Sequence, residues 1–475
     1  MATRVDTDLC IIGGGSGGLS VAAGAAQMGA RCVLVEHGKM GGDCLNYGCV
    51  PSKSLIAAAQ AADTIARAAR FGVSAGPPHV DFGAVNAHVH GVIGAIAPHD
   101  SVERFEGLGV RVIQETGRFT GPATLNAGDA EVHAKRFVIA TGSAPLVPPI
   151  PGLETVSYFT NETIFDLQEA PERLIIVGGG PIGLEMAQAH RRLGCAVEVV
   201  EANTILNKDD PELADVVRRQ VLDEGVSLYE GATVTGVAPG AGGGVRVTLE
   251  GDDAPDAVEG SHLLLAIGRA ANVDGLGLDE AGVAYTKRGI EVDARLRTTN
   301  KKIFAIGDVA GGYQFTHVAS YHAGIVIRNA LFRLPAKADH DAVPWVTYTD
   351  PELAHVGLTE TAARDAGHNP TVVRAPFEEI DRARAERRED GFIKAVIGKR
   401  GRVLGASIVG VHAGELILPW VFAVGGKLSV KDMASVIAPY PTLSEISKRA
   451  AGSYYTPNLF SDRTRWIVRL LLKLG

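Results

Sequence analysis

Two copies of one glycine motif, 165 residues apart, predict an α/β protein built on two βαβ units. Each copy follows an apolar run typical of a strand and precedes an apolar or alanine-rich run typical of a helix. A change in composition from about Asp341, with Trp345, several tyrosines and fewer glycine motifs, predicts a separate C-terminal α+β domain. At 475 residues the chain is too long for one hydrophobic core, so several domains are expected.

The composition is that of an ordinary globular protein, with 46% apolar and 21% charged residues. The net charge of −8 argues against a nucleic-acid partner. The first residues carry no basic patch followed by an apolar stretch, so we expect no secretory signal and a cytoplasmic protein.

The two copies of the motif are closely similar. Ile11–Leu19 reads I-I-G-G-G-S-G-G-L and Ile176–Leu184 reads I-V-G-G-G-P-I-G-L, and Glu36 and Glu201 each follow the first glycine by 23 positions. In such a unit the glycines allow a tight turn, a close approach to a pyrophosphate and close helix packing, and the acid accepts hydrogen bonds from a ribose. The motif glycines are Gly13, Gly15 and Gly18, and Gly178, Gly180 and Gly183. We therefore expect two bound dinucleotides.

Other segments have simple patterns. Ser52–Arg70 is alanine-rich and predicts a helix, while Arg136–Gly142 predicts a buried strand ending in a glycine turn. Pro145–Pro151 is typical of a linker. Ala232–Gly268 alternates apolar and polar residues around a glycine turn and predicts antiparallel strands. Lys302–Asp308 predicts another buried strand that ends at a Gly-Asp pair.

Two of the five cysteines have a distinctive setting. Cys44 and Cys49 lie in Gly41–Lys53, G-G-D-C-L-N-Y-G-C-V-P-S-K, at the head of a predicted helix just after the first acid. Thiols five positions apart cannot pair on a regular helix, so the first turn should be distorted, and the helix N-terminus should favour thiolates. No further ligands lie nearby for zinc, so we expect no metal. The pair can instead take two electrons from a reduced flavin. Cys10, Cys32 and Cys195 are expected to be buried small hydrophobic residues.

Taken together, these motifs resemble those of the class I pyridine nucleotide–disulfide oxidoreductases, the family of dihydrolipoamide dehydrogenase, glutathione reductase and mercuric reductase. The resemblance covers essentially the whole chain. It includes the glycine motif at Gly13–Gly18, the Cys44–Cys49 helix, Ala140–Gly142, the second glycine motif, Gly268-Arg269 with Asn272, Gly307-Asp308 and Pro344–Glu360.

The resemblance implies an oxidoreductase with two Rossmann-like dinucleotide-binding domains, for FAD and NAD, and a C-terminal α+β dimerisation domain, acting as a homodimer. The implied domains are 1–150 and 273–340 for FAD, 151–272 for NAD(P), 341–460 for the interface, and 461–475 as a basic amphipathic tail.

The resemblance also implies residue roles. Cys49 should be the thiol against the flavin and Cys44 the thiol facing substrate, with Lys53 near the flavin and paired with Glu185. The implied cofactor-binding residues are Gly13, Gly15, Gly18, Glu36, Gly42, Lys53, Thr141, Gly142, Gly178, Gly180, Gly183, Glu201, Gly268, Arg269, Gly307, Asp308 and His317. For His317 and His322 a packing role is the alternative, and the more favoured one. NADH is favoured because Glu201 would repel a 2′-phosphate, although Lys208 leaves use of NADPH open.

The chain departs from the family pattern on the substrate side. Dithiol-using members carry His in H-P-T-x-x-E, where this chain reads A-P-Y-P-T-L-S-E-I over Ala438–Ile446. Glu445 is kept, but Tyr440 replaces the base, and a tyrosine with an ordinary pKa near 10 is a poor base at neutral pH. Asp43 stands where Thr is common and should raise the pKa of Cys44. Pro181 implies a nicotinamide pocket without a tyrosine gate.

The sequence therefore leaves several electron acceptors possible. We expect a small-molecule or protein disulfide or thiol. The alternatives are a lipoamide dehydrogenase proper, a metal reductase like mercuric reductase, and a membrane-associated NADH:quinone dehydrogenase. The chain has no cysteine after Cys195, whereas mercuric reductases have a C-terminal pair.

The tail, Ser461–Gly475, has a basic stripe and many apolar residues. Arg465, Arg469 and Lys473 recur every four residues beside Trp466. This pattern suits a helix lying at a membrane surface, and the alternative is a helix packed on the dimer partner or another subunit.

Overall fold

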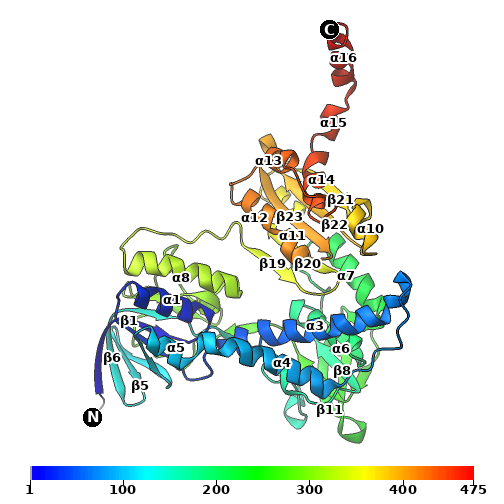
Figure 1. The fold of residues 1–475 in the computed structure, drawn as a ribbon. Helices are drawn as coiled ribbons and strands as arrows, with labels where there is room; N and C mark the ends of the chain where they lie inside the picture. The colour runs from blue at the N-terminus through cyan, green and yellow to red at the C-terminus, as the bar shows by residue number, and fades with distance from the viewer. Residues whose placement is uncertain (1–2, 475) are drawn as a thin grey trace. The chain divides into compact units, whose positions relative to one another are not determined.

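The computed structural model describes residues 3–474, and the chain forms two compact units. The first comprises Met1–Gly179, Ala189–Ala202 and Gly231–Asp339, and the second comprises Gly180–Gln188, Asn203–Glu230 and His340–Gly475. The chain is mixed α/β, as the sequence predicts (Figure 1). Among residues 3–474, no helix is both long and apolar enough to cross a membrane.

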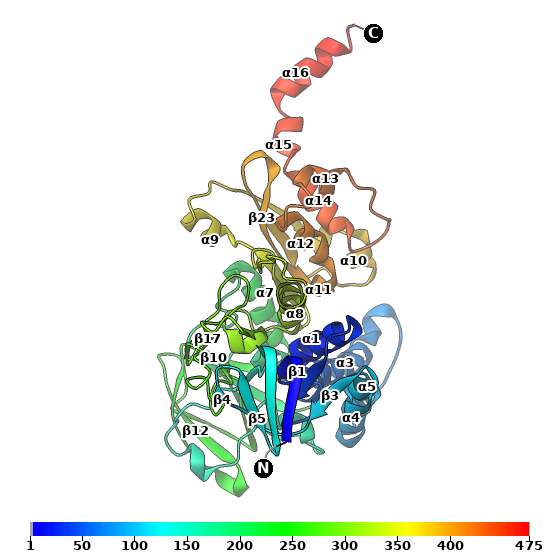
Figure 2. The ribbon, with the colours of Figure 1, turned by 90° about the vertical axis from the view of Figure 1, so that its left-hand side faces the viewer.

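A seven-stranded sheet is the centre of the first unit, in the order β3-β2-β1-β6-β5-β4, with β18 also pairing with β6. Its strands are β1 (Thr3–Ile12), β2 (Cys32–Val35), β3 (Val110–Ile113), β4 (Gly117–Gly121), β5 (Thr124–Ala127), β6 (Ala130–Ile139) and β18 (Ile303–Ala305). β1, β2, β3, β6 and β18 pair in parallel, and β4 and β5 form an antiparallel extension. Helix α1 (Ser16–Gln27) connects β1 to β2 and lies beside α8 (Thr316–Ala330) (Figure 2).

Apolar side chains fill both faces of this sheet. Leu9 and Ile11 of β1 pack with Leu19 of α1 and Ile325 of α8, while Cys10 and Ile12 point into the cluster on the other face. This alternation follows from the two-residue period of a strand, and a parallel sheet needs both faces covered. Cys10, Cys32 and Cys195 are buried, as expected.

A second parallel sheet, β9-β8-β14, contains β8 (Arg173–Val177), β9 (Ala196–Glu201) and β14 (His262–Leu265). Beside it lies the antiparallel sheet of β11 (Thr233–Pro239), β12 (Val245–Glu250) and β13 (Ala257–Gly260). The expectation of antiparallel strands over Ala232–Gly268 is therefore wrong for its last part. Leu263–Leu265 is a continuous apolar run buried on both faces, which suits a parallel strand rather than an alternating one.

Some boundaries also differ from those expected. The buried strand expected over Arg136–Gly142 is β6, which begins at Ala130 and ends at Ile139. The expected linker begins in a strand, because β7 (Ser143–Pro145) pairs with β15 (Arg269–Ala271). The remaining elements of this unit are α2 (Gly42–Asn46), α3 (Cys49–Ala66), α4 (Phe82–Ile96), α5 (Val102–Gly107), β16 (Tyr285–Thr286) and β17 (Gly289–Ile290). Helix α6 (Pro181–Arg192) follows β8 and begins at its proline; its residues up to Gln188 belong to the second unit and the rest to the first.

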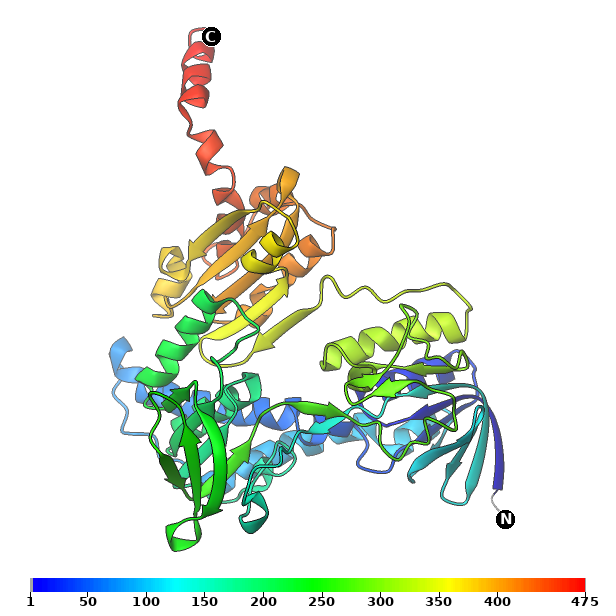
Figure 3. The ribbon, with the colours of Figure 1, turned by 180° about the vertical axis from the view of Figure 1, so that it is seen from behind.

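The second unit contains a five-stranded antiparallel sheet in the order β19-β20-β23-β22-β21, covered by helices (Figure 3). The strands are β19 (Pro344–Thr347), β20 (Glu352–Gly357), β21 (Thr371–Pro376), β22 (Phe392–Ile397) and β23 (Val403–Gly410). The helices are α7 (Pro211–Asp223), α9 (Glu360–Asp365), α10 (Asp381–Ala385), α11 (Ala413–Leu416), α12 (Leu418–Val424), α13 (Val430–Ser435), α14 (Glu445–Ser453), α15 (Thr456–Leu459) and α16 (Asp462–Leu471). Strand β10 (Ser227–Glu230) also belongs to this unit. The fully buried Trp420 and Phe377 anchor its core.

Candidate active site

The two glycine turns have nearly the same geometry, 165 residues apart. Gly13 has a φ of +108°, and a Cβ there would lie 2.3 Å from the carbonyl oxygen of Ala140. Gly178 has a φ of +114°, and its Cβ would lie 2.4 Å from the carbonyl oxygen of Ala266. Only glycine fits such a backbone at such a close approach. In each turn the backbone of the motif therefore passes directly beside a neighbouring segment, with no side chain between them.

The two acids hold these turns in the same way. The Glu36 carboxylate accepts a hydrogen bond from the Gly14 N–H at 2.5 Å, and the Glu201 carboxylate accepts one from the Gly179 N–H at 2.7 Å. In each βαβ unit, the acid expected to bind a ribose thus lies at the glycine turn. The ribose hydroxyls of a bound dinucleotide and the backbone of the turn would share this carboxylate.

The first turn fits a dinucleotide pyrophosphate. Gly15 precedes α1 and supplies no side-chain cap to the helix N-terminus. Beside it, a Cβ on Gly42 would lie 2.7 Å from the Gly15 Cα, so the two segments meet backbone to backbone. Uncapped N–H groups at a helix start with no side chain over them form an anion cradle.

The cysteine pair lies where the chain breaks between two helices. Cys44 is in α2 and Cys49 is the first residue of α3, and Tyr47 and Gly48 between them are not helical. The distortion expected for two thiols five positions apart is therefore present. Cys44 is half-buried and Cys49 is exposed, and both are free thiols.

The two thiols differ in acidity. A hydrogen bond with Cys44, the Thr316 hydroxyl and the charge of Lys53 together lower the pKa of Cys49 to about 6, against the opposing effects of desolvation by the protein around the sulfur and of Asp43. The same hydrogen bond, with burial, raises the pKa of Cys44. The Thr316 hydroxyl lies 3.5 Å from the Cys49 sulfur. Thr316 also begins α8, so Cys49 lies at the N-termini of two helices, which favours a thiolate.

Asp43, next to Cys44, is held in an ion pair. Its carboxylate lies 3.1 Å from the Arg269 guanidinium and accepts a hydrogen bond from the Asn161 amide at 3.0 Å. Asp43 does raise the pKa of Cys44, as expected, but its effect is smaller than those of the hydrogen bond with Cys49 and of burial.

Arg269 is also connected to Asp308 through a hydrogen-bonded serine. Its guanidinium donates to the Ser143 hydroxyl at 2.7 Å, and that hydroxyl donates to the Asp308 carboxylate at 2.5 Å. Burial raises the pKa of Asp308, while Ser143 and Arg269 lower it. A polar chain therefore runs from Asp43, beside Cys44, to Asp308.

Four further residues singled out in the sequence make hydrogen bonds or ring contacts in the first unit. Thr141 and Asn272 exchange side-chain to backbone hydrogen bonds at 2.9 Å in each direction, which joins the segments after β6 and β15. His322 is buried and its Nδ1 accepts from the Gly307 N–H at 3.2 Å, so it has the packing role given as the favoured alternative. His317 stacks on Phe315 with ring centroids 5.2 Å apart.

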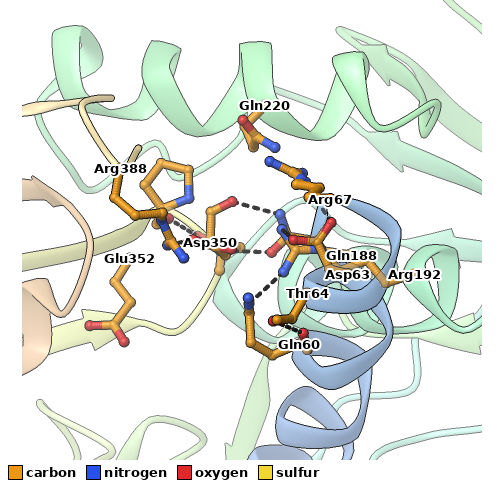
Figure 4. Close-up of polar contacts among 12 residues, drawn as sticks. Gln60, Asp63, Thr64, Arg67, Gln188, Arg192, Gln220, Asp350, Glu352 and Arg388 are labelled. Atoms are coloured by element: carbon orange, nitrogen blue, oxygen red, sulfur yellow. Dashed lines mark hydrogen bonds and ion pairs between the residues drawn. The ribbon is translucent and has the colours of Figure 1, made fainter. Parts of the chain in front are cut away.

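Polar contacts also fix α3 at its far end. Arg192, at the end of α6, donates to the Gln60 amide oxygen of α3 at 2.7 Å and lies 3.9 Å from Asp63 (Figure 4). Asp63 also pairs with Arg67 at 2.7 Å. The helix that carries Cys49 is therefore tied at both ends by side-chain contacts.

In the second unit, Glu185 is buried and its carboxylate accepts the Tyr348 N–H at 2.9 Å. Gln188, one turn further on, exchanges two hydrogen bonds with the Asp350 backbone, whose carboxylate pairs with Arg388 (Figure 4). These contacts hold Glu185 and Gln188 of α6 within this unit. The pairing of Glu185 with Lys53 stays a prediction.

Tyr440 has a partner that the sequence does not suggest. Its hydroxyl donates to the Asp381 carboxylate at 2.8 Å, and this contact raises the pKa of Tyr440. The residue as a whole is 70% exposed. Glu445, expected to orient a base here, instead accepts the Thr442 N–H at 3.4 Å. Tyr440 is therefore a hydrogen-bond donor and not a base at neutral pH.

Sequence reasoning missed Thr316, Ser143 and Asn161. Thr316 stands beside His317 in a segment already singled out for its histidines, and its place at the head of a helix was the available signal. Ser143 and Asn161 carry no motif of their own. Among residues 3–474, no cluster of three or more His, Cys, Asp or Glu side chains could hold a metal ion.

Two glycine turns for dinucleotides and a cysteine pair of unequal acidity define a flavoprotein of the disulfide-reductase class. Residues 7–323 match the family model "Pyridine nucleotide-disulphide oxidoreductase", and residues 343–451 match that family's dimerisation domain. The chain belongs to the pyridine nucleotide–disulfide oxidoreductase family, whose members use FAD and NAD(P). The dimerisation domain supports a homodimer.

Several relatives are similar over nearly their full length. A mercuric reductase of Streptomyces lividans is 36% identical over 94% of this chain and 96% of its own. A dihydrolipoyl dehydrogenase of Geobacillus stearothermophilus is 34% identical over the same shares. A Cu(II) complex of RclA, a HOCl-induced flavoprotein disulfide reductase of Escherichia coli, is similar with a TM-score of 0.84 and 30% identity over 93% of this chain and 99% of that one.

Proposed function

We propose that this enzyme is an NADH-dependent reductase that passes electrons through FAD to the Cys44–Cys49 disulfide and then to a small-molecule or protein disulfide, which is released as thiols. The observation that carries the proposal is the placement of the two thiols: Cys44 and Cys49 flank the break between α2 and α3, and Cys49 begins α3 beside the Thr316 hydroxyl. This setting lowers the pKa of Cys49 and raises that of Cys44, as a pair needs if one sulfur stays a thiolate and the other exchanges with the acceptor.

The bound cofactors supply two electrons from the nicotinamide to the disulfide. The chain's residues do the rest. On reduction the Cys44–Cys49 bond breaks, Cys49 keeps the thiolate and Cys44 takes a proton. The Cys44 sulfur, once deprotonated, attacks an acceptor disulfide and releases the first acceptor thiolate. Cys49 then attacks Cys44, which restores the disulfide and releases the second, and two protons complete the acceptor thiols.

Removing the proton from Cys44 is the difficult step, because the pKa of this thiol is raised. The residue at the family's base position, Tyr440, donates a hydrogen bond to Asp381 and offers no base. This observation favours a second candidate acceptor, a thiophilic metal ion. Such an ion displaces the thiol proton on binding and needs no positioned base. The names of two similar proteins, a mercuric reductase and an RclA bound to Cu(II), agree with this chemistry. Two electrons would reduce one Hg(II) to the metal, or two Cu(II) to Cu(I), and close the disulfide.

NADH is the proposed donor because Glu201 lies at the second glycine turn. A carboxylate there accepts a ribose 2′-hydroxyl and repels a 2′-phosphate. Comparing initial rates with NADH and NADPH tests this point. A preference for NADPH would contradict the role given to Glu201.

The test of the cycle is anaerobic reduction of the holoenzyme with one equivalent of NADH. Two new thiols should appear, identified by alkylation and mass spectrometry as Cys44 and Cys49. The Cys49→Ser variant should gain none, and Cys195→Ala, which changes a buried cysteine outside the site, should behave as the unchanged protein. Failure of the thiols to appear would overturn the proposal.

An acceptor screen separates the candidates. Lipoamide, glutathione disulfide, Hg(II), Cu(II) and a soluble quinone are each tested with NADH. Disulfide or metal turnover should be lost in Cys44→Ala. Quinone turnover that survives in this variant would favour the alternative in which the flavin alone reduces a quinone.

A further inference from the structure

The last helix of the chain, α16 (Asp462–Leu471), is exposed on every side. None of its ten residues is buried, and the apolar chain continues to Leu474. Trp466 is 63% exposed, Leu471 59%, Leu472 76% and Leu474 78%. Large apolar side chains gathered this closely at a surface usually mark an interaction site.

The exposed side chains of α16 and of the residues that follow it divide between a basic face and an aliphatic face. At 100° per residue, Arg465, Arg469 and Lys473 fall on one stripe, and Asp462 lies beside them. The opposite face of the helix carries the aliphatic residues Ile467, Val468, Leu470 and Leu471, with Arg463 among them, and Leu472 and Leu474 follow the end of the helix. Trp466 stands at the border between the two faces. Such a division, with an aromatic residue at the border, suits the interface between water and lipid.

Charge identifies the kind of partner. Residues 462–474 contain four basic residues and one acid, although the chain as a whole carries a net charge of −8. Arg465 is 3.8 Å from Asp462, an exposed pair that leaves the stripe cationic. An aliphatic face beside a cationic stripe complements a surface that is apolar inside and anionic outside.

The position and length of α16 favour a membrane surface over the dimerisation domain or a membrane span as its partner. The match to the dimerisation domain ends at residue 451, before α16 begins. Ten helical residues rise about 15 Å, half of a bilayer's hydrocarbon core of about 30 Å. The helix can therefore lie in a membrane surface but cannot span it.

We propose that α16 binds the surface of an anionic lipid membrane. Its aliphatic face enters the boundary of the acyl chains, and Arg465, Arg469 and Lys473 contact lipid phosphates. This binding places the reductase at the membrane while its redox cycle continues unchanged. The inference does not depend on the acceptor given under the proposed function.

The test is sedimentation of the full-length holoenzyme with vesicles of phosphatidylcholine, with and without phosphatidylglycerol. The protein should pellet with the anionic vesicles and not with the neutral ones, and raised salt should release it. The triple variant R465Q/R469Q/K473Q should bind roughly 100-fold more weakly, since each cation near an anionic surface contributes several-fold. Trp466 fluorescence should shift to the blue on binding, and Trp466→Phe should remove that shift.

A matched triple variant, R382Q/K399Q/R400Q, removes three charges from the same unit outside α16. It should bind vesicles as the unchanged protein does, and all variants should keep NADH turnover with a soluble acceptor. Equal losses in both triple variants, or no pelleting at all, would overturn the proposal. A shift from dimer to monomer in the α16 variant without vesicle binding would overturn it in favour of a contact with a second copy.

Discussion

The Thr316 hydroxyl should help to set the acidity of Cys49. Thr316→Val keeps the branched shape but removes the hydroxyl that lies 3.5 Å from the sulfur. A hydrogen bond to a charged group contributes about 1.5–3 kcal/mol, and one pKa unit corresponds to about 1.36 kcal/mol. Because the contact is long and Cys49 is exposed, we take the lower end, about one unit. The pKa of Cys49 should then rise from about 6 to about 7.

The assay follows the long-wavelength absorbance of the NADH-reduced holoenzyme, which under the proposed function arises from a Cys49 thiolate beside the flavin. A group with a lowered pKa stays deprotonated above that value, so the band should persist above pH about 6 and fade below it. In Thr316→Val the midpoint should move up by about one unit.

Two controls separate the hydroxyl from the shape of the site. Thr316→Ser keeps the donor and should keep the midpoint. Cys44→Ala removes the larger cause of the lowered pKa; because this variant has no disulfide to reduce, its band is followed without NADH, and the midpoint should move further than in Thr316→Val. An unchanged midpoint in Thr316→Val, or an equal shift in Thr316→Ser, would refute the reasoning.

Three further changes should have distinct effects. Gly13→Ala should lose bound FAD, measured as flavin absorbance per chain, because its Cβ would lie 2.3 Å from a carbonyl oxygen; Gly91→Ala, with open space around it, should keep the flavin. Asp43→Asn should lower the pKa of Cys44 by less than about one unit, read from the pH profile of its alkylation, and an upward shift would contradict the assigned cause. Tyr440→His should raise lipoamide turnover at least about tenfold, and no gain would show that position 440 does not limit that reaction.

The sequence predicted the parts of the fold that depend on backbone geometry. Gly13 and Gly178 stand where only glycine fits, so a one-dimensional motif was enough to identify both turns. The strand at His262–Leu265 was assigned to the wrong kind of sheet, because three leucines in a row do not reveal which strand lies beside them.

The contacts of the site were less predictable. Thr316 contacts Cys49 although the two are 267 positions apart in the sequence, and Asn161 contacts Asp43 at a separation of 118 positions. No local sequence pattern predicts contacts between residues so far apart. Tyr440 was singled out as a departure from the family pattern. Its partner Asp381, 59 positions away, became visible only in the folded chain.

The contact between Tyr440 and Asp381 also bears on the acceptor. The contact raises the pKa of Tyr440, so the phenol keeps its proton at neutral pH and supplies no phenolate base. Under the proposed function, the Cys44 thiol, whose pKa is raised, then loses its proton to solvent or to the acceptor itself. An acceptor that displaces protons on binding, as a thiophilic metal does, bypasses this step, and its turnover should depend little on pH near neutrality. A disulfide acceptor cannot bypass it, and its turnover should rise with pH, so the pH dependence of turnover distinguishes the two candidates.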